Sequence, residues 1–314
     1  MKLQTEIKLK AQENNLIDYN SKVLLLGSCF TENIGDKFEY FKFQNNRNPF
    51  GILFHPKAIE NLSVRSIHRQ KYLEKELFFY NEQWHCFDAH SQLSNTSKKD
   101  LIVTLNNSLE FTHQQIKQAT HIIITLGTAW VYNLIETNRV VANCHKVSPN
   151  EFGKILLSIK EIKQSLTTII KTVQSTNPKA SIIFTVSPVR HIKDGFVENT
   201  RSKSHLISAI HQVVTKQVFY FPSYEIMLDE LRDYRFYKSD MLHPNATAVD
   251  YIYQKFQHVW VAVEATKTME AVDAIQKGMH HKPFNKNSEA HQKFHEQLIQ
   301  KQKIVKSQFN HITF

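Results

Sequence analysis

Two stretches of the 314-residue chain carry side chains that can do chemistry together. Ser28 lies near the start, and its hydroxyl is a potential nucleophile. Much later, Asp240 stands three residues before His243. On a turn or a first helical turn, this spacing brings the carboxylate to the imidazole, where it fixes the tautomer and stabilises the imidazolium formed when histidine takes a serine proton. This spacing is common by chance, so it indicates acyl transfer through a serine ester only in combination with a nucleophile such as Ser28.

The neighbours of Ser28 indicate how its hydroxyl is presented. The apolar run Lys22–Leu26 is stopped by Gly27, a pattern typical of a strand buried on both faces of a parallel sheet. The segment Thr31–Tyr40 spaces apolar residues four apart, as an amphipathic helix does. We therefore expect Ser28 at the carboxyl edge of a sheet, beside amides at the positive end of a helix dipole. The alternative is a serine that only caps the helix.

The same pattern of a buried strand stopped by small or polar residues recurs later in the chain. It appears at His121–Leu126 and Ser181–Val186. Between them, Ser148–Glu151 resembles a capping box that starts a long helix, which Asn177 and Pro178 end. The remaining predicted elements are a helix near Arg201–Lys216, a strand at Val218–Phe221 and a helix after Pro244.

Strands that alternate with helices predict an α/β fold with a central parallel sheet and a site at the carboxyl ends of its strands. The less regular segment from Asn45 to about Gln115 is predicted to be an insertion beside the site, with a loop at Ser91–Asp100. After Thr266 we expect one or two peripheral helices. The predicted units are a main domain over residues 1–265 and a basic, mostly helical extension over 266–314.

The chain is strongly basic, with a formal net charge of +10. Lysines that neutralise phosphates give affinity for nucleic acids. The stretch from Lys267 to Phe314 alone holds eight lysines against four acidic residues, and elsewhere basic residues are mixed with acids. No RNA motif, Cys/His finger or recognition helix accompanies them. We therefore predict a solvated basic surface and no specific nucleic-acid partner.

No apolar run in the sequence approaches the roughly 18 residues that a bilayer-spanning helix needs, so no membrane insertion is predicted. The first residues alternate charged and apolar side chains and lack the hydrophobic centre of a secretory signal, which favours a cytoplasmic location. The sequence also predicts neither metal nor organic cofactor. The three cysteines, Cys29, Cys86 and Cys144, are widely spaced and fit neither a zinc cluster nor a disulfide framework. The histidines of the tail have no acidic or cysteine residues nearby that would complete a metal site: His280, His281, His291 and His295.

The segment Gly27–Phe30, Gly-Ser-Cys-Phe, is similar to the signature that names the GSCFA family, an SGNH-hydrolase-like group. Thr31 stands where the family name has alanine. Further segments that resemble the family extend the similarity over roughly residues 20–260: Asn48–Gly51, Leu126–Thr128, Asn143–Lys146, Ser187–His191 and Asp240–Pro244.

The resemblance implies a three-layer α/β/α, flavodoxin-like SGNH-hydrolase fold with a central parallel sheet. It implies Ser28 as the nucleophile, His243 as the general base and Asp240 as the partner that orients the base. Gly51 corresponds to the glycine whose backbone N–H joins the oxyanion hole.

One departure concerns the third sequence block of SGNH enzymes, in which an asparagine follows two residues after a glycine. Here Gly127 is followed by Ala129 at that place. Thr128, Asn143 or the Trp130 indole is an alternative donor, and the sequence does not choose among them. For Asn143, an asparagine that only forms a turn is an equally good interpretation. The residues expected at the oxyanion hole or around the substrate are Cys29, Asn48, Gly51, Gly127, Thr128, Asn143, His145 and Arg190.

Several of these residues have a second interpretation. Cys29 is either a reactive thiol or, as we favour, a packing cysteine. Cys144 and His145 are expected on a strand with opposite orientations, which argues against a Cys-His pair and leaves His145 and Lys146 for substrate contact. Arg190 is either a clamp for a carboxylate or phosphate or one partner of a structural ion pair.

The sequence thus predicts a serine esterase of SGNH type that hydrolyses a small, acetyl-like ester on a glycan or similar metabolite through an acyl-enzyme. Two alternatives stay open. One is an O-acyltransferase that uses the same triad, and the other is a non-catalytic ligand-binding module with the same fold. The acyl group, the acceptor and the oligomeric state are not specified by the sequence.

Overall fold

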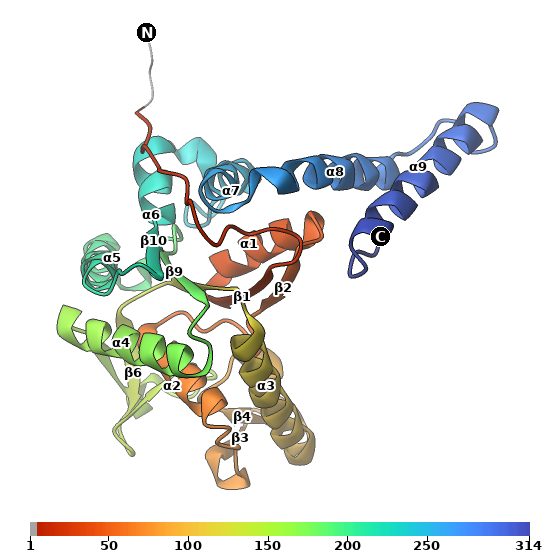
Figure 1. Ribbon diagram of the computed structural model, residues 1–314. Helices are drawn as coiled ribbons and strands as arrows, with labels where there is room; N and C mark the ends of the chain where they lie inside the picture. Colours follow the sequence, from red (N-terminus) through yellow and green to blue (C-terminus); the bar gives the residue numbers. More distant parts are fainter. Residues whose placement is uncertain (1–4) are drawn as a thin grey trace.

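The computed structural model describes residues 5–314 and is built around a sheet of five parallel strands (Figure 1). The strand order is β10-β9-β5-β1-β2, which is the flavodoxin-like arrangement. The order reverses between β1 and β5, and in sheets of this topology ligands bind outside the carboxyl ends of those two strands. The strands are β1 (Lys22–Gly27), β2 (Gln44–Arg47), β5 (His121–Leu126), β9 (Ser181–Val186) and β10 (Val218–Phe221).

Alternate residues of the central strands face two separate hydrophobic cores. Leu24 and Leu26 of β1 pack with the helices of one layer, whereas Val23 and Leu25 pack with those of the other. The first layer contains α2 (Pro56–Ile67), α3 (Lys98–Gln118), α4 (Ile159–Thr176) and α5 (Phe196–His211). The second contains α1 (Cys29–Tyr40), α7 (Ala246–Trp260) and α8 (Thr266–His280). The structure is therefore the predicted three-layer α/β/α fold.

Two small antiparallel sheets extend the first layer. The β3–β4 hairpin lies between α2 and α3, and the sheet with order β7-β6-β8 directly follows β5. The short α6 follows β10 and leads into a π-helical turn. The bounds are β3 (Leu77–Tyr80), β4 (Gln83–Cys86), β6 (Trp130–Leu134), β7 (Arg139–Val141), β8 (Phe152–Leu156), α6 (Ser223–Glu225) and the turn Ile226–Glu230.

The predicted start of the long helix at Ser148–Glu151 is wrong. That segment forms a single 3-10 turn, and the next five residues form β8, which pairs with β6. Helix α4 begins later, where Ser158 and Glu161 make the reciprocal hydrogen bonds of a real capping box. Two similar capping signals lie ten residues apart, and strand pairing decides which one starts the helix.

The segment from Asn45 to Gln115 is more regular than predicted. It holds α2, the β3–β4 hairpin and most of α3. The predicted loop at Ser91–Asp100 contains a 3-10 turn and the first turn of α3, which Ser97 caps. The buried face of α3 is a narrow stripe in a polar sequence, which explains why its helical period was missed: Leu101, Leu105, Leu109, Thr112 and Ile116.

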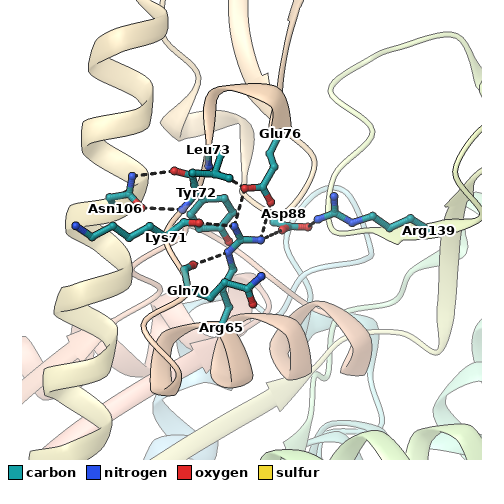
Figure 2. A network of polar contacts seen from close by, with 9 residues as sticks. All are labelled: Arg65, Gln70, Lys71, Tyr72, Leu73, Glu76, Asp88, Asn106 and Arg139. Atoms are coloured by element: carbon teal, nitrogen blue, oxygen red, sulfur yellow. Dashed lines mark hydrogen bonds and ion pairs between the residues drawn. The ribbon is translucent and has the colours of Figure 1, made fainter.

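A neutral network of charges fixes this segment (Figure 2). The Arg65 guanidinium of α2 pairs with Glu76 at 2.8 Å and lies 3.7 Å from Asp88. Asp88 also pairs with Arg139 at the start of β7. Arg65 stacks 3.7 Å from the ring centroid of Tyr72, which is itself buried. Each charge in the network has a partner, as buried ions require.

The C-terminal tail is helical, as predicted, but it is less peripheral than expected. Figure 1 shows α8 continuing from the end of α7 past α1 and away from the sheet, with α9 (Glu289–Gln308) beyond it, and α9 packs on α8. Tyr40 of α1 donates to Asp273 of α8 at 2.8 Å, and Leu298 of α9 is buried in the second core. The division of the chain at residue 265 into two units stays a prediction. Among residues 5–314, none of the helices is long and apolar enough to cross a bilayer.

Candidate active site

Ser28 occupies the N-cap of α1 at the carboxyl end of β1. Its hydroxyl oxygen accepts a hydrogen bond from the backbone N–H of Phe30 at 3.3 Å, so it does cap the helix. The capping bond uses an oxygen lone pair and leaves the O–H proton available to a base. Ser28 is 1 % exposed, and its own backbone N–H donates to the carbonyl of Thr125 at 3.0 Å. The two interpretations of Ser28 are therefore compatible.

Gly27 makes the close approach of β1 and β5 possible. Its φ angle is +137°, in the region that favours glycine, and a Cβ added there would lie 2.2 Å from the carbonyl oxygen of Thr125. No other residue fits this position without moving a strand. Ser28 is consequently held at the carboxyl ends of β1 and β5, where ligands bind in sheets of this topology.

Asp240 and His243 are in direct contact. Nδ1 of His243 lies 2.7 Å from one carboxylate oxygen of Asp240. The other oxygen accepts from the backbone N–H groups of Leu242 at 2.8 Å and of His243 at 3.0 Å. These bonds, led by that from the His243 N–H, lower the pKa of Asp240 to about 2. An ionised carboxylate only accepts hydrogen bonds, so Nδ1 carries the ring proton and Nε2 is free to accept one.

The turn that carries this pair is tied down at several points. Lys238 donates through its backbone N–H to the carbonyl of His243 at 2.7 Å, which closes the loop. Asn245 caps α7 through Ala248 N–H at 3.1 Å. The backbone N–H of Arg190, just after β9, donates to the Leu242 carbonyl at 3.2 Å. The turn is therefore fixed to α7 and to the loop after β9.

The turn also lies beside α1. Lys238 and Pro244 line a surface hollow together with Asn33 and Lys37 of α1. The Lys238 charge acts on the Cys29 thiol, which directly follows Ser28. The fold thus brings the Asp240–His243 turn to the helix whose first turn presents Ser28.

Asn48 and Gly51 shape this edge of the sheet. Asn48 accepts from the Gly27 N–H at 2.9 Å through its side chain and donates to the Leu25 carbonyl at 2.9 Å through its backbone. Gly51 has a φ of +72°, and a Cβ there would lie 2.4 Å from the Cβ of His90. The Gly51 N–H, predicted for the oxyanion hole, donates to the Asn48 carbonyl at 2.8 Å. It would have to share that bond to contact an oxyanion.

The Gly127–Ala129 loop is held from α5. The Thr128 hydroxyl pairs with the Ser202 hydroxyl at 2.9 Å, and the Ala129 N–H donates to the same Ser202 oxygen at 2.7 Å. The Trp130 indole donates to the carbonyl of Glu198 at 3.3 Å. Thr128 and Trp130, two of the three predicted substitutes for the missing asparagine, therefore already have partners.

Lys203 is a site residue that the sequence interpretation missed. Its ammonium donates to the Gly127 carbonyl at 2.7 Å and to the Ser187 carbonyl at 2.8 Å, joining the ends of β5 and β9. It is 1 % exposed, and burial lowers its pKa to about 7. No carboxylate of residues 5–314 pairs with it. The signal in the sequence was a lysine in line with Leu206 and Ile210 on the buried face of α5.

His191 lies beside the same loop. Its ring stacks on Phe54 at a centroid distance of 5.9 Å, and a Cβ on Gly127 would lie 3.0 Å from its Nε2. Burial first, and then the charges of Lys203 and His243, lower the pKa of His191 to about 3. The Nε2 atom is buried without a hydrogen-bond partner among the described residues. The neutral ring therefore lines the site on the side of β9.

Asn143 and His145 belong to a turn, so the predicted strand geometry for Cys144 and His145 is wrong. The His145 N–H donates to the Asn143 side chain at 2.8 Å, and the φ of His145 is +50°. The imidazole contacts the Cys86 carbonyl at 2.8 Å and lies against Phe78. Burial lowers the pKa of His145 to about 4. These contacts give both residues a structural role against the β3–β4 hairpin.

The two remaining candidates differ in their surroundings. Burial raises the pKa of the Cys29 thiol, which keeps it protonated and supports the packing interpretation. The Arg190 guanidinium lies over Tyr237 and Tyr234, at 4.2 and 5.2 Å from the ring centroids. The ion-pair alternative for Arg190 finds no carboxylate partner within residues 5–314.

Over the same residues, no cluster of His, Cys, Asp and Glu has the geometry of a metal site.

Comparison with solved structures gives distant similarities. The chain is similar to a carbohydrate esterase family 3 from Talaromyces cellulolyticus, with 9% identity, a TM-score of 0.36, and coverage of 81% of this chain and 99% of that one. An acetyl esterase mutant with acetate ion gives 10% identity, a TM-score of 0.36 and the same coverage. An acetyl xylan esterase from the rumen bacterium Butyrivibrio proteoclasticus gives 11% identity and a TM-score of 0.39, with coverage of 84% of this chain and 66% of that one. No curated protein matches the chain.

Family models match most of the sequence. The model of the GSCFA family matches residues 22–256, which include β1, Ser28 and the Asp240–His243 turn. The model of the GSCFA domain protein, C-terminal domain, matches residues 272–314, which include most of α8 and all of α9. The resemblance first seen in Gly27–Phe30 is confirmed, and the chain belongs to the GSCFA family.

Proposed function

We propose that this protein is a serine esterase of SGNH type, with Ser28 as nucleophile, His243 as general base and Asp240 as the carboxylate that orients the base. One observation carries the proposal. The hydrogen-bonded Asp240–His243 pair lies on a turn beside α1, and Ser28 caps α1 at the carboxyl end of β1, next to the point where the strand order reverses.

The reaction begins when Nε2 of His243 takes the proton of the Ser28 hydroxyl. The oxygen attacks the acyl carbonyl carbon, and the tetrahedral intermediate collapses as the ester C–O bond breaks. The imidazolium returns its proton to the departing alcohol. Asp240 stabilises the imidazolium through the 2.7 Å bond to Nδ1. Water then attacks the acyl-enzyme by the same steps and releases the acid.

The charge that develops on the carbonyl oxygen is stabilised by the first turn of α1. The first turn of α1 carries the positive end of the helix dipole. The N–H groups of Ser28, Phe30 and Thr31 already donate to acceptors within the chain, so the dipole, and not hydrogen bonds from these three groups, provides the stabilisation. The Lys203 ammonium adds positive charge at the ends of β5 and β9. This arrangement supplies electrostatic stabilisation where other SGNH enzymes place an asparagine.

The substrate is a small, acetyl-like ester carried on a glycan or similar metabolite. Transfer of the acyl group to a second alcohol uses the same acyl-enzyme and differs only in what resolves it, so an O-acyltransferase is the alternative activity. A non-catalytic binding module is the other alternative. Ala129 favours it, because the block that usually supplies an oxyanion donor has none here.

The test is covalent labelling with a fluorophosphonate, followed by mass spectrometry of the labelled peptide. We expect an adduct on Ser28 in the wild type, none in Ser28→Ala and a strongly slowed reaction in His243→Ala. Ser204→Ala and His258→Ala change an exposed serine and an exposed histidine and serve as matched controls. An unlabelled wild type would favour the binding module, and ester hydrolysis that survives Ser28→Ala would move the nucleophile to Cys29.

A further inference from the structure

A cavity of about 190 Å³ lies next to the Asp240–His243 turn. Its volume far exceeds the roughly 10–15 Å³ that one water molecule requires. It opens between the loop after β9 and the segment that leads to the turn. The residues that line it are Arg190, Met227, Leu228, Leu231, Arg232, Asp233, Tyr234 and Tyr237.

The Arg190 guanidinium is the central polar group of this cavity. It lies over the Tyr237 ring, 4.2 Å from the ring centroid, with the Tyr234 centroid at 5.2 Å. Contact with aromatic faces restrains a guanidinium. Arg190 also interacts with the Tyr237 hydroxyl group, which leaves its other N–H groups for a ligand. Within residues 5–314, no carboxylate forms an ion pair with Arg190. The cavity thus contains an oriented set of donors without a counterion.

The other charges at the cavity do not neutralise Arg190. Asp233 is already paired with Arg235, whose guanidinium lies 3.0 Å from its carboxylate. Arg232 adds a second positive charge and has only a long contact, 3.6 Å, with the exposed Asp229. The cavity therefore has a net positive charge that favours an anion.

The cavity is connected to the reacting groups through the backbone. The Arg190 N–H donates to the Leu242 carbonyl at 3.2 Å, one residue before His243. Tyr237 forms a β-bridge with Pro244, one residue after it. A group bound by the arginine is consequently held at a fixed offset from His243.

We propose that this cavity binds an anionic group, a carboxylate or a phosphate, of the ester substrate. The link to catalysis rests on the proposed esterase function, whereas anion binding does not. The substrate is then an acidic ester, whose alcohol or acyl part carries the anion several bonds from the scissile carbonyl. Arg190 and Arg232 select it over a neutral ester of the same size, because a planar guanidinium binds carboxylate and phosphate oxygens in pairs.

The experiment measures anion binding without turnover. Full-length Ser28→Ala protein is titrated calorimetrically with succinate and, separately, with inorganic phosphate at constant ionic strength. We expect saturable binding of at least one anion, and the stronger binder identifies the group as carboxylate or phosphate. Adding Arg190→Gln should weaken binding about tenfold or more, and Arg190→Lys should weaken it less, because the charge stays but the paired geometry is lost.

The controls separate this proposal from the esterase proposal. Arg69→Gln removes the same charge from an exposed arginine of the α2–α3 side and should leave binding unchanged. Arg232→Gln should weaken binding only a few-fold. Wild-type protein that labels with fluorophosphonate but binds neither anion overturns the cavity proposal alone. Binding that Arg190→Gln and Arg69→Gln change equally overturns it as well. Anion binding without any labelling keeps the cavity and refutes the esterase.

Discussion

Two arginines of this protein lie on tyrosine rings, and they differ in what neutralises their charge. Arg65 lies 3.7 Å from the ring centroid of Tyr72 and pairs with Glu76 at 2.8 Å, inside the network of Figure 2. Arg190 lies 4.2 Å from the ring centroid of Tyr237 and pairs with no carboxylate of residues 5–314. Both guanidinium groups lie over a tyrosine ring, but only the first arginine has a counterion among the described residues.

The comparison teaches that a stacked arginine does not by itself mark a binding site. A buried charge needs a partner, and the Arg65 network provides one from within the chain. The Arg190 cavity leaves the position of the partner open, beside the turn that carries His243. Substitutions near Arg65 should therefore act on stability, and substitutions near Arg190 and His243 should act on binding and rate.

The largest effect on the His243 side is expected from Asp240→Asn. An asparagine side chain donates to Nδ1 and thereby places the ring proton on Nε2, where it can no longer accept the serine proton. We expect kcat for para-nitrophenyl acetate to fall by roughly a thousandfold or more. The urea midpoint should stay close to that of the wild type, because Asp240 is exposed. A variant that keeps a third of the wild-type rate would contradict the triad.

On the Arg65 side, Arg65→Met should act on stability alone. Removing the guanidinium leaves Glu76 without its ion pair and Asp88 without one of its two arginines in a buried setting. We expect a loss of about 3–5 kcal/mol in the free energy of unfolding, measured in urea. The exposed Arg69–Glu110 pair provides the control, since Arg69→Gln should change stability little. If Arg65→Met and Arg69→Gln lowered the free energy of unfolding equally, the buried network around Arg65 would contribute no more than the exposed Arg69–Glu110 pair.

Lys203 combines features of Arg65 and Arg190. It is buried like Arg65, but like Arg190 it has no carboxylate partner among residues 5–314, and its hydrogen bonds go only to backbone carbonyls. Its pKa in the folded protein, about 7, is below the usual value, so above pH 7 the unfolded chain binds the additional proton. The stability of the wild type relative to Lys203→Met should therefore rise with pH between about 7 and 10, by at most about 1.4 kcal/mol per pH unit. Urea unfolding of both proteins at several pH values measures this difference. A flat difference would mean that Lys203 stays protonated throughout.

The Lys203→Met substitution should also lower kcat about tenfold, because the Gly127 and Ser187 carbonyls lose the donor that holds them at the site. Lys203→Arg restores the charge but not the fit in a fully buried position, so it should not rescue the rate. A wild-type rate in Lys203→Met would restrict this residue to a packing role.

The sequence was informative where contacts are local or strands are continuously apolar. Strands β1, β5, β9 and β10 were predicted at their observed positions because each is a short apolar run bounded by a turn signal. The Asp240–His243 contact was predicted because three residues of chain fix its geometry. Strand β2, with the sequence Gln-Asn-Asn-Arg, was missed, since it lies at the sheet edge and pairs with β1 through its backbone alone.

Contacts between distant segments were beyond the sequence. Nothing local indicates that Ser202 would hold Thr128, or that the Gly51 N–H would close a turn with Asn48. The spacing of Lys203 from Leu206 and Ile210 indicates the buried face of α5, but it does not indicate the two carbonyls at strand ends that accept its hydrogen bonds. These partners are set by how α5 packs over the sheet, a tertiary property that periodicity does not encode.

The smallest effect on stability is expected from Arg190→Gln, and it tests directly how Arg190 differs from Arg65. Arg190→Gln removes a stacked guanidinium with no ion pair, so its cost to the free energy of unfolding should be about 1 kcal/mol or less, the size of one cation–π contact. Saturating succinate or phosphate should raise the melting temperature of the wild type and of Arg65→Met, since a ligand that binds only the folded state stabilises it. Arg190→Gln should lose that shift. If Arg190→Gln instead destabilised the protein as strongly as Arg65→Met, the Arg190 guanidinium would have a structural role. Its lack of a carboxylate partner would then no longer be a reason to expect a bound anion.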